Sequence, residues 1–229
     1  MNTEIFTGKA EAYAKARPSY PVAAIDYICS IAPQDAVFAD IGAGTGKLTV
    51  LLAERGYTVL AVEPNADMQS QLTDTLAPYT NAKSVAASAE STTLPDHSVD
   101  VVTCAQALHW FDTNAFRAEC KRILKPGGIV VAVYNTTANS GSANNCSRST
   151  NAFFADPIIH EFPNPIFYTR EHWLTYMTSH SHDPLPSDPQ YAAHMAEMNA
   201  IFDRESTCGM LRRDVVTTVY SEEILPVQA

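Results

Sequence analysis

No stretch of this sequence is long and apolar enough to cross a membrane as a helix. Such a helix needs about 18 or more consecutive apolar residues, and no run in the 229 positions approaches that length. The N-terminal residues MNTEIFTGKAEAYAKARPSYP also lack the apolar centre of a secretory signal peptide. We therefore expect a cytoplasmic protein without a membrane partner.

A disulfide framework is missing as well. The five cysteines are odd in number, scattered, and include no Cys-x-x-Cys pair: Cys29, Cys104, Cys120, Cys146 and Cys208. Small secreted scaffolds depend on paired cysteines. Cys104 and Cys120 fall in segments that we expect to be buried. The pattern indicates reduced thiols and a reducing compartment.

Positively charged residues are few. The chain has 15 Lys and Arg against 25 Asp and Glu, which gives a formal net charge of -10. An acidic surface repels phosphate backbones, so we expect no nucleic-acid partner. A small-molecule substrate is the remaining expectation. Nothing in the sequence indicates the oligomeric state.

Short apolar runs alternate with helical patterns in the first half of the chain. The expected strands are 36–41, 58–63, 82–86, 98–105 and 129–134. Between them, helical faces are marked by Leu48, Leu51 and Leu52, and by Phe116, Cys120, Ile123 and Leu124. Alternating strands and helices form βαβ units, in which helices cover both faces of a mainly parallel sheet. The sequence therefore predicts a doubly wound α/β fold in a single domain.

Local signals set the ends of several elements. Asn65 and Asp112 are candidate helix N-caps, and Lys125-Pro126-Gly127-Gly128 is a helix stop. Before the first strand we expect a helix that ends near Ile31 and packs on the sheet edge or across the top of the site. The later elements are a surface loop or lid at 135–150, a strand at 158–167, a short capped helix at 169–178, a proline-rich turn at 184–189, a helix marked by Met195, Met198 and Phe202, and a last strand at 215–220.

Glycine is also scarce, with nine residues in all, yet three of them lie in five positions of ADIGAGTGKL, residues 39–48. A glycine-rich turn between a strand and a helix brings backbone groups close to a ligand. ATP-binding P-loops require GxxxxGK followed by Ser or Thr, and here Ile41 and Leu48 stand at two of the specified positions. Dinucleotide loops require GxGxxG, and Lys47 stands at the third glycine.

A third type of loop fits at every specified position. The nucleoside-binding loop of S-adenosylmethionine (SAM) dependent enzymes has Asp or Glu followed by xGxGxG, as does Asp40 to Gly46. An acid about twenty residues later accepts hydrogen bonds from ribose hydroxyls in nucleotide-binding folds, and Glu63 stands there. A tight turn without a ligand is the alternative for the loop, and a helix-capping charge is the alternative for Glu63.

Further motifs follow in order: Ala61-Val62-Glu63-Pro64, Ala87-Ser88-Ala89-Glu90, Gln106-Ala107-Leu108-His109-Trp110-Phe111 and Arg122-Ile123-Leu124-Lys125-Pro126-Gly127-Gly128. With the glycine loop they cover 36–134 and resemble class I SAM-dependent methyltransferases. The N-terminal Tyr-x-x-x-Arg-Pro-x-Tyr-Pro at 13–21 is similar to a motif of the small-molecule enzymes related to trans-aconitate methyltransferases. The later TREHW, DPQY, IFD and TTVY stretches look similar too, with less specificity.

The resemblance implies an enzyme that uses SAM as cofactor and releases S-adenosyl-L-homocysteine (SAH). It implies the Rossmann-like methyltransferase fold, with a seven-stranded sheet whose last strand is antiparallel. Within the single domain 1–229, it implies an N-terminal helical cap at 1–35, a cofactor-binding half at 36–135 and a substrate-side elaboration at 136–229.

The resemblance also assigns cofactor-binding residues by position: Tyr13, Arg17, Asp40, Gly42, Ala43, Gly44, Glu63, Pro64, Met68, Ser88, Ala89, Glu90, Gln106, Ala107 and Trp110. The implied roles are loop orientation for Asp40, ribose binding for Glu63, cover of the adenine for Met68, contact with the adenine edge for Ala89 and Glu90, and contact with the methionine portion and substrate for Gln106, Ala107 and Trp110. Ser88 stands where many relatives carry Asp, and no family motif matches 139–149.

Two side chains are candidates for chemistry beyond cofactor binding. His109 is the candidate catalytic base, with a packing or orienting role as its alternative. Arg17, together with Tyr13 and Tyr20, is a candidate clamp for a carboxylate of the cofactor or substrate, with a surface arginine as its alternative. Five further histidines have no carboxylate or cysteine at ligand spacing, so we expect no metal site: His160, His172, His180, His182 and His194.

The leading hypothesis is methyl transfer from SAM to a small polar or acidic metabolite by in-line displacement. A SAM-binding sensor or partner subunit without turnover is the alternative from another class. An NAD-dependent oxidoreductase is disfavoured by Lys47. Nucleic-acid methylation is disfavoured by Gln106-Ala107-Leu108-His109, which replaces the Asp/Asn-Pro-Pro-Tyr/Phe motif of base-amine enzymes.

Overall fold

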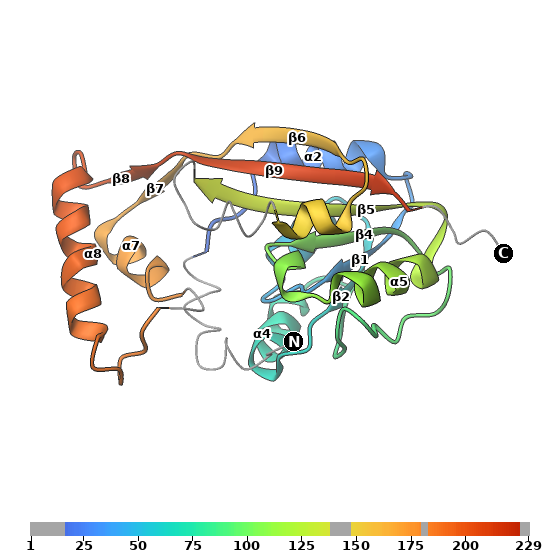
Figure 1. Cartoon of the computed structure of the whole chain (residues 1–229), viewed down its shortest axis with the longest axis horizontal. Coiled ribbons are helices and arrows are strands. Elements are labelled where there is room, and N and C mark those ends of the chain that lie inside the picture. Colours follow the sequence, from blue (N-terminus) through green and yellow to red (C-terminus); the bar gives the residue numbers. More distant parts are fainter. Residues whose placement is uncertain (1–16, 138–147, 180–182, 225–229) are drawn as a thin grey trace.

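A computed structural model describes residues 17–137, 148–179 and 183–224 of the chain (Figure 1). Its main sheet has seven strands in the order β3-β2-β1-β4-β5-β9-β6. These are β1 (Val37–Ile41), β2 (Thr58–Val62), β3 (Ala82–Val85), β4 (Val99–Ala105), β5 (Leu124–Thr137), β6 (Ile158–Pro163) and β9 (Val215–Glu223). Strands β1 to β5 pair in parallel, and β9 is antiparallel to both β5 and β6. The predicted α/β sheet with an antiparallel last strand is confirmed.

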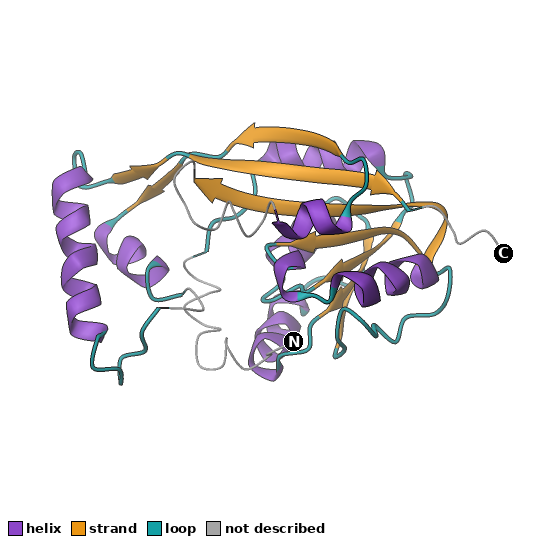
Figure 2. Cartoon of the chain, in the orientation of Figure 1, coloured by secondary structure: helices purple, strands orange, loops and turns teal. Residues whose placement is uncertain are grey.

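Helices lie on both faces of the sheet (Figure 2). They are α2 (Val22–Ile31), α3 (Lys47–Ala53), α4 (Ala66–Leu76) and α5 (Thr113–Ile123), with a short 3₁₀ turn, η2 (Leu108–Trp110). Neighbouring residues of one strand enter opposite cores, because side chains alternate across a sheet. Phe38 and Val101 pack with α2 and α3, whereas Ala39 and Val102 pack with α5. This double burial explains why the strands are apolar without alternation.

The predicted helix ends agree closely with the structure. The side chain of Asn65 accepts a hydrogen bond from Met68 N at 2.9 Å, and that of Asp112 accepts one from Ala115 N at 2.9 Å, so both are N-caps. Helix α5 ends at Ile123, just before the predicted stop. Leu124, which we expected on the helical face, is instead the first residue of β5.

The loop or lid expected at 135–150 was wrong for the part of it that the structure describes. Residues 135–137 do not begin a loop but extend β5, and 148–153 are helical; 138–147 lie outside the described residues. Helix α2 packs on a face of the sheet through Ala24, Ile25 and Ile28, and its Tyr27 reaches the edge strand β6, where its ring lies 4.1 Å from that of His160. Its buried side chains share one core with residues of β4, β5 and β9.

The strand expected at 158–167 is two strands. Strand β6 pairs with β9 as far as Pro163, and β7 (Ile166–Tyr168) pairs with β8 (Leu211–Arg213) in a separate two-stranded sheet. The pairing of Pro163 with Val216 and that of Ile166 with Arg213 lie three positions apart on both sides, so the two ladders share one register. The interruption falls at a Pro-Asn-Pro sequence, since proline has no N–H for the ladder.

A smaller lobe stands at the far end of this ribbon, at the left in Figure 1. It consists of β7, β8, α7 (Arg170–Tyr176) and α8 (Tyr191–Glu205) around a core of Tyr168, Trp173, Met198, Phe202 and Leu211. The predicted helix at 169–178, the helical face of Met198 and Phe202, and the last strand are confirmed. The division of the chain as a single domain stays a prediction.

None of the helices in the described ranges has both the length and the apolar character to cross a membrane. Of the cysteines that the structure describes, Cys29, Cys104, Cys120 and Cys208 have free thiols, and Cys104 and Cys120 are buried as expected. Cys146 lies outside the described residues.

Candidate functional site

The glycine loop connects the end of β1 to the start of α3 at the carboxyl edge of the sheet. Gly42, Gly44 and Gly46 all have positive φ, at 68°, 58° and 91°. A Cβ atom on Gly42 would lie 2.8 Å from Cβ of Ala107, and one on Gly46 would lie 2.9 Å from Cδ1 of Leu72. The conformation and close packing of the turn therefore require glycine at these positions even before a ligand is considered.

The N–H groups of the loop bind within the chain. Gly42 N and Ala43 N donate to the carbonyl of Val62, at 2.9 and 3.1 Å. Gly44 N donates to Oε2 of Glu63 at 2.9 Å. These donors are used inside the protein, so a ligand at this loop would meet its bare Cα surface and its carbonyl groups.

Glu63 follows β2 and bridges two neighbouring turns. Its other oxygen, Oε1, accepts from Asn65 N at 2.9 Å, and the side chain is 6% exposed. Burial raises the pKa of this carboxyl, against a lowering by the two backbone donors. A carboxylate oxygen has room for a second donor, so Glu63 could also accept from hydroxyl groups of a bound sugar. The contact with Asn65 agrees in part with the capping alternative.

Asp40, the last polar residue of β1, points into the protein. Its carboxylate accepts from Thr49 Oγ1 at 2.6 Å and from Thr103 Oγ1 at 3.0 Å. Burial raises its pKa to about 6, and only 1% of its surface is exposed. The side chain thereby ties the start of the loop to α3 and β4.

The end of β4 makes a second tight turn beside the loop. Gln106 has a φ of 55°, in the left-handed region. Its N donates to the carbonyl of Val133 at 2.9 Å, and its Nε2 donates to that of Asn135 at 3.0 Å. Strained backbone of this kind is found at functional sites when neighbouring contacts hold it. Here the extended part of β5 holds it.

His109 lies on the 3₁₀ turn just after Gln106. Its ring packs against Trp110 at a centroid distance of 4.7 Å and against Tyr134 at 6.1 Å. Its Nδ1 is buried and has no hydrogen-bond partner among the described residues. Burial, and then the positive charge of Arg17, lower the pKa of the imidazole to about 4. The ring is therefore neutral at pH 7. In that form one ring nitrogen donates and the other accepts, so the tautomer decides which role Nδ1 has.

A pocket opens over the glycine loop and brings distant segments together. Its lining includes Arg17, Tyr20, Asp40, Gly42, Ala43, Thr45, Lys47, Gln106, Asn135, Thr136, Thr137, Tyr176 and Val215. Five of the predicted cofactor-binding residues line it: Arg17, Asp40, Gly42, Ala43 and Gln106. The others do not: Gly44, Glu63, Pro64, Met68, Ser88, Ala89, Glu90, Ala107 and Trp110; nor does His109. Tyr13 lies outside the described residues.

The predicted adenine side is closed in this conformation. Met68 and Ala89 are 3% and 2% exposed, so neither presents a broad face to a ligand. Ser88 forms a bridge with Ser91. Glu90 accepts from Asp112 N at 3.0 Å through Oε1. The segment is thus held by its own short contacts, and its role in cofactor binding stays a prediction.

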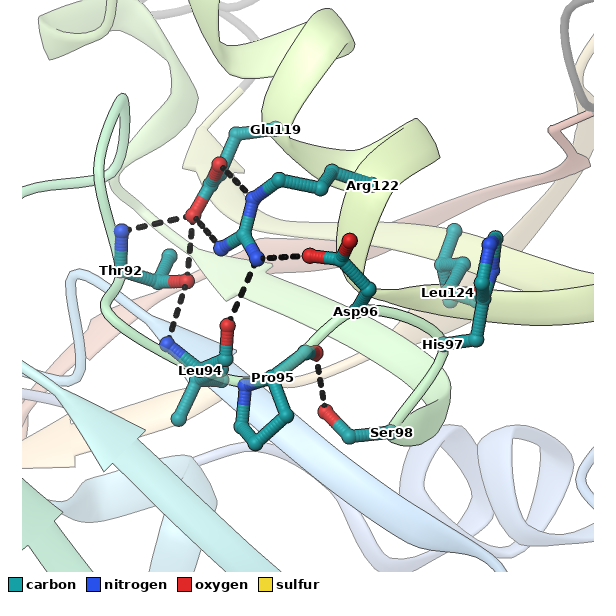
Figure 3. A network of polar contacts seen from close by, with 9 residues as sticks. All are labelled: Thr92, Leu94, Pro95, Asp96, His97, Ser98, Glu119, Arg122 and Leu124. Atoms are coloured by element: carbon teal, nitrogen blue, oxygen red, sulfur yellow. Dashed lines mark hydrogen bonds and ion pairs between the residues drawn. The ribbon is translucent and has the colours of Figure 1, made fainter.

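A polar network that is buried at Thr92 and Glu119 and exposed at Asp96 fixes the chain just beyond this segment (Figure 3). Glu119 accepts from Thr92 N at 2.7 Å, from Thr92 Oγ1 at 2.5 Å and from Arg122 Nη2 at 2.7 Å. Arg122 also donates to the carbonyl of Leu94 at 2.8 Å and to Asp96 at 2.6 Å. Because both Glu119 and Arg122 belong to α5, this helix anchors the connection between Glu90 and β4.

The sequence motifs missed several pocket residues. Lys47 was noted only as a mismatch to the dinucleotide loop, although its place directly after Gly46 was a signal. Tyr176 comes from α7, and Asn135 to Thr137 from the segment expected to be a loop. Asn135 to Thr137 lie at the pocket because β5 is longer than expected, and Tyr176 lies there because of the position of the small lobe. Local sequence patterns predicted neither feature.

The described histidines are engaged in packing or in hydrogen bonds. His160 packs on Tyr27 at 4.1 Å, His172 packs on Tyr168 at 4.9 Å, and His194 Nε2 lies 2.8 Å from the carbonyl of Met177. Within the described ranges no three His, Cys, Asp or Glu side chains come together as metal ligands would. His180 and His182 lie outside these ranges.

Comparison with known proteins gives a consistent result. A family model described as "Methyltransferase domain" matches residues 39–132. An uncharacterized methyltransferase of Mycobacterium tuberculosis (strain H37Rv) is 44% identical over 131 residues, covering 57% of this chain and 52% of the relative. A putative methyltransferase of Dictyostelium discoideum is 35% identical over 129 residues, covering 55% and 47%. This chain therefore spans about half the length of the curated relatives it matches.

Solved structures match over most of the chain. A putative type II methyltransferase from Anaeromyxobacter dehalogenans is 25% identical, with a TM-score of 0.60 over 92% of this chain and 99% of the other. A putative methyltransferase from an antibiotic biosynthesis pathway of Anabaena variabilis is 20% identical, with a TM-score of 0.61 over 90% and 98%. The likeness thus extends beyond residues 39–132 to the strands and lobe that follow.

Proposed function

We propose that this chain, which has the Rossmann-like methyltransferase fold and matches a methyltransferase domain at residues 39–132, transfers a methyl group from SAM to a small, carboxylate-bearing molecule. The family match, the named relatives and the structural neighbours support a SAM-dependent methyltransferase. The acceptor class, and a place near the trans-aconitate methyltransferase branch suggested by Arg17-Pro18 and Tyr20-Pro21, belong to the proposal.

The observation that carries the proposal is the contact between Gly44 and Glu63. It sets a buried carboxylate beside a bare glycine turn at the carboxyl ends of two adjacent parallel strands, where α/β folds bind their ligands. A ribose can donate its hydroxyls to Glu63 while its plane lies along the loop. Lys47 occupies the position at which a dinucleotide loop needs its third glycine, which favours a nucleoside over NAD.

The main contribution of the chain to this reaction is to align the two reactants. In SAM the methyl carbon is bound to a positive sulfur, so a nucleophilic oxygen forms its bond to that carbon as the carbon–sulfur bond breaks, leaving neutral SAH. The chain holds the reactants in line and excludes water, and alignment of this kind contributes on the order of 7–11 kcal/mol. A carboxylate acceptor is already ionised at pH 7, so no base is required.

His109 fits this role as a neutral group. A general base works best with a pKa near the working pH, and the pKa of His109 is lowered to about 4. We therefore assign His109 an orienting hydrogen bond through its buried Nδ1. This favours an acceptor that is ionised before it binds, such as a carboxylate.

The first test of the proposal is calorimetric titration with SAM, SAH and NADH. Wild type should bind SAM and SAH and give no heat with NADH. Glu63→Gln should weaken SAH binding by about tenfold or more, the cost of a charge-assisted hydrogen bond. Glu197→Gln is the matched control, because Glu197 is exposed on α8, away from the loop. Tight NADH binding without SAH binding would overturn the proposal.

A second measurement separates an enzyme from a binding protein. Purified protein is incubated with SAM and a panel of small carboxylic acids, and formation of SAH is followed. An enzyme releases SAH only with its acceptor, whereas a SAM sensor binds the cofactor and releases none with any member of the panel. The latter result would favour the sensor alternative.

A further inference from the structure

Residues 17–20, which we call the strap, form part of the wall of the pocket over the glycine loop. The strap precedes α2 in the chain. Gly42 and Ala43 of the loop line the pocket together with three residues of the strap: Arg17, Pro18 and Tyr20. A molecule that fills this pocket therefore contacts both the glycine loop and the strap.

The remaining residue of the strap, Ser19, is the point at which it is fixed to the main sheet. The carbonyl of Ser19 accepts from Nδ2 of Asn135 at 3.2 Å and from Nδ2 of Asn164 at 3.0 Å. Asn135 belongs to the polar end of β5, and Asn164 lies in the Pro-Asn-Pro segment between β6 and β7. Both contacts use the backbone of Ser19, so they do not depend on its side chain.

A buried threonine orients the two amides. Thr217 of β9 is 0% exposed, and its Oγ1 donates to Oδ1 of Asn135 at 2.5 Å. Nδ2 of Asn164 lies 3.3 Å from Oδ1 of Asn135 and 3.2 Å from Oγ1 of Thr217. Because Oδ1 of Asn135 is engaged in this way, its NH₂ group is turned toward the strap. The tether is formed before a ligand arrives, which lowers the entropic cost of binding.

The strap also contacts the small lobe. Nη2 of Arg17 donates to the carbonyl of Ser179 at 3.3 Å, and the guanidinium carbon lies 5.6 Å from the centre of the Tyr176 ring. The strap thus links the lobe, through Arg17, with the sheet, through Ser19. Asn164 holds this link from outside, since it is not one of the residues that line the pocket. Its effect on a bound ligand is therefore indirect.

The pocket lies on the side where the methionine end of the cofactor is expected. Gln106, which is expected to contact the methionine portion, lines it and donates from Nε2 to the carbonyl of Asn135 at 3.0 Å, whereas Glu63, expected at the ribose, does not line it. We propose that Asn164 is a positioning residue, which holds the strap over the methionine end of SAM and leaves the nucleoside end unaffected. This rests on the proposed function.

The first test is calorimetric titration with SAH and with 5′-methylthioadenosine, which lacks the amino-acid portion. Asn164→Ala should weaken SAH binding by about three- to tenfold, the size expected for one hydrogen bond, and leave methylthioadenosine binding unchanged. Asn151→Ala, which changes an exposed asparagine of the helical segment 148–153, is the matched control. Ser19→Ala keeps the carbonyl and should bind SAH as the wild type does. Equal weakening of both ligands in Asn164→Ala, or unchanged SAH binding, would overturn the proposal.

A second measurement observes the tether without a ligand. Ser19-Tyr20 is the only Ser-Tyr pair in the sequence. Serine labelled with carbon-13 at the carbonyl, combined with tyrosine labelled with nitrogen-15, therefore gives one correlated NMR signal, from the Ser19 carbonyl. Its carbon shift should move in Asn164→Ala, because a hydrogen bond is lost, and stay in place in Asn151→Ala. An unchanged shift in Asn164→Ala would refute the tether, whatever the titrations give.

Two provisions keep the outcomes distinct. Thermal unfolding shows whether Asn164→Ala is folded; if it is not, Thr217→Val takes its place, because it removes the hydroxyl that orients Asn135 and keeps the shape of the side chain. The same loss of SAH affinity relative to methylthioadenosine is then expected. Failure of wild type to bind either ligand refutes the proposed function, and the role of Asn164 with it. An unchanged ratio in a protein that binds both ligands refutes the role of Asn164 alone.

Discussion

The N–H of Gly44 donates a 2.9 Å hydrogen bond to Oε2 of Glu63. This contact joins the turn after β1 to the residue after β2, and Glu63 extends it to Asn65, the N-cap of α4. One carboxylate thus fixes two turns and a helix start at the edge of the sheet. Changes to the turn should therefore affect stability and ligand binding together.

Gly42→Ala should destabilise the fold more than Gly56→Ala does. Both glycines have positive φ, 68° and 88°, but a Cβ on Gly42 meets Ala107 at 2.8 Å whereas one on Gly56 meets nothing within 4 Å. Each change carries the left-handed strain of alanine, about 1–2 kcal/mol. Gly42→Ala adds an overpacking cost of roughly 1–3 kcal/mol. Urea unfolding measures both, and equal losses would contradict the packing argument.

Asp40 should make stability depend on pH between about 4 and 6. Burial raises its pKa from 3.8 to about 6, so in this window the unfolded chain releases a proton that the folded chain retains. Stability from this group is full below pH 3.8 and is lost as pH rises through about 6, by an amount on the order of 3 kcal/mol. Asp40→Asn should remove this part of the slope. Urea unfolding of both proteins from pH 4 to 7.5 is the measurement; parallel curves would refute the prediction.

His109 should titrate well below the usual range for histidine. Its ring is largely buried beside Trp110 and within the field of Arg17, so NMR of the imidazole should give a midpoint near pH 4, with His109→Gln used to assign the signal. Between pH 6 and 7, the pH–rate profiles of the wild type and of His109→Gln should have the same shape, because His109 does not titrate there. A midpoint close to 6.5 would restore the catalytic-base interpretation.

Glu119→Ala should be strongly destabilising, because it leaves the N–H of Thr92 and one side of Arg122 without their acceptor. The expected loss is about 2–4 kcal/mol. Asp96→Ala removes an ion pair of Arg122 whose acid is 69% exposed, and it should cost less than about 1 kcal/mol. Thermal unfolding compares the two. Similar losses would indicate that the network of Figure 3 acts through its exposed pair.

The sequence predicted strands β1 to β5 and the helices between them well, for a physical reason. Strands buried on both faces require continuous apolar runs, and side-chain caps such as Asn65 and Asp112 are local. The polar end of β5 was not predicted, because backbone pairing with β9 holds it in the sheet and residue composition does not reveal such pairing. The division of β6 from β7 depends on two prolines within one otherwise regular ribbon.

The candidate site was predictable only where its residues lie within a motif. Asp40, Gly42 and Glu63 belong to short patterns with fixed spacing. Tyr176 lies at the pocket because β6, β7 and α7 bring it there. Lys47 lines the same pocket as Arg17, which is distant from it in the sequence. Contacts between segments this distant leave no trace in local periodicity.

The ribbon that carries the small lobe has a consequence for diversification. Residues 166–213 leave and re-enter the main sheet through two adjacent strands of one register, so this insert can be exchanged as a cassette while the seven-stranded scaffold stays intact. Because Tyr176 of α7 lines the pocket, such an exchange would change the shape of the pocket without rebuilding the glycine turn.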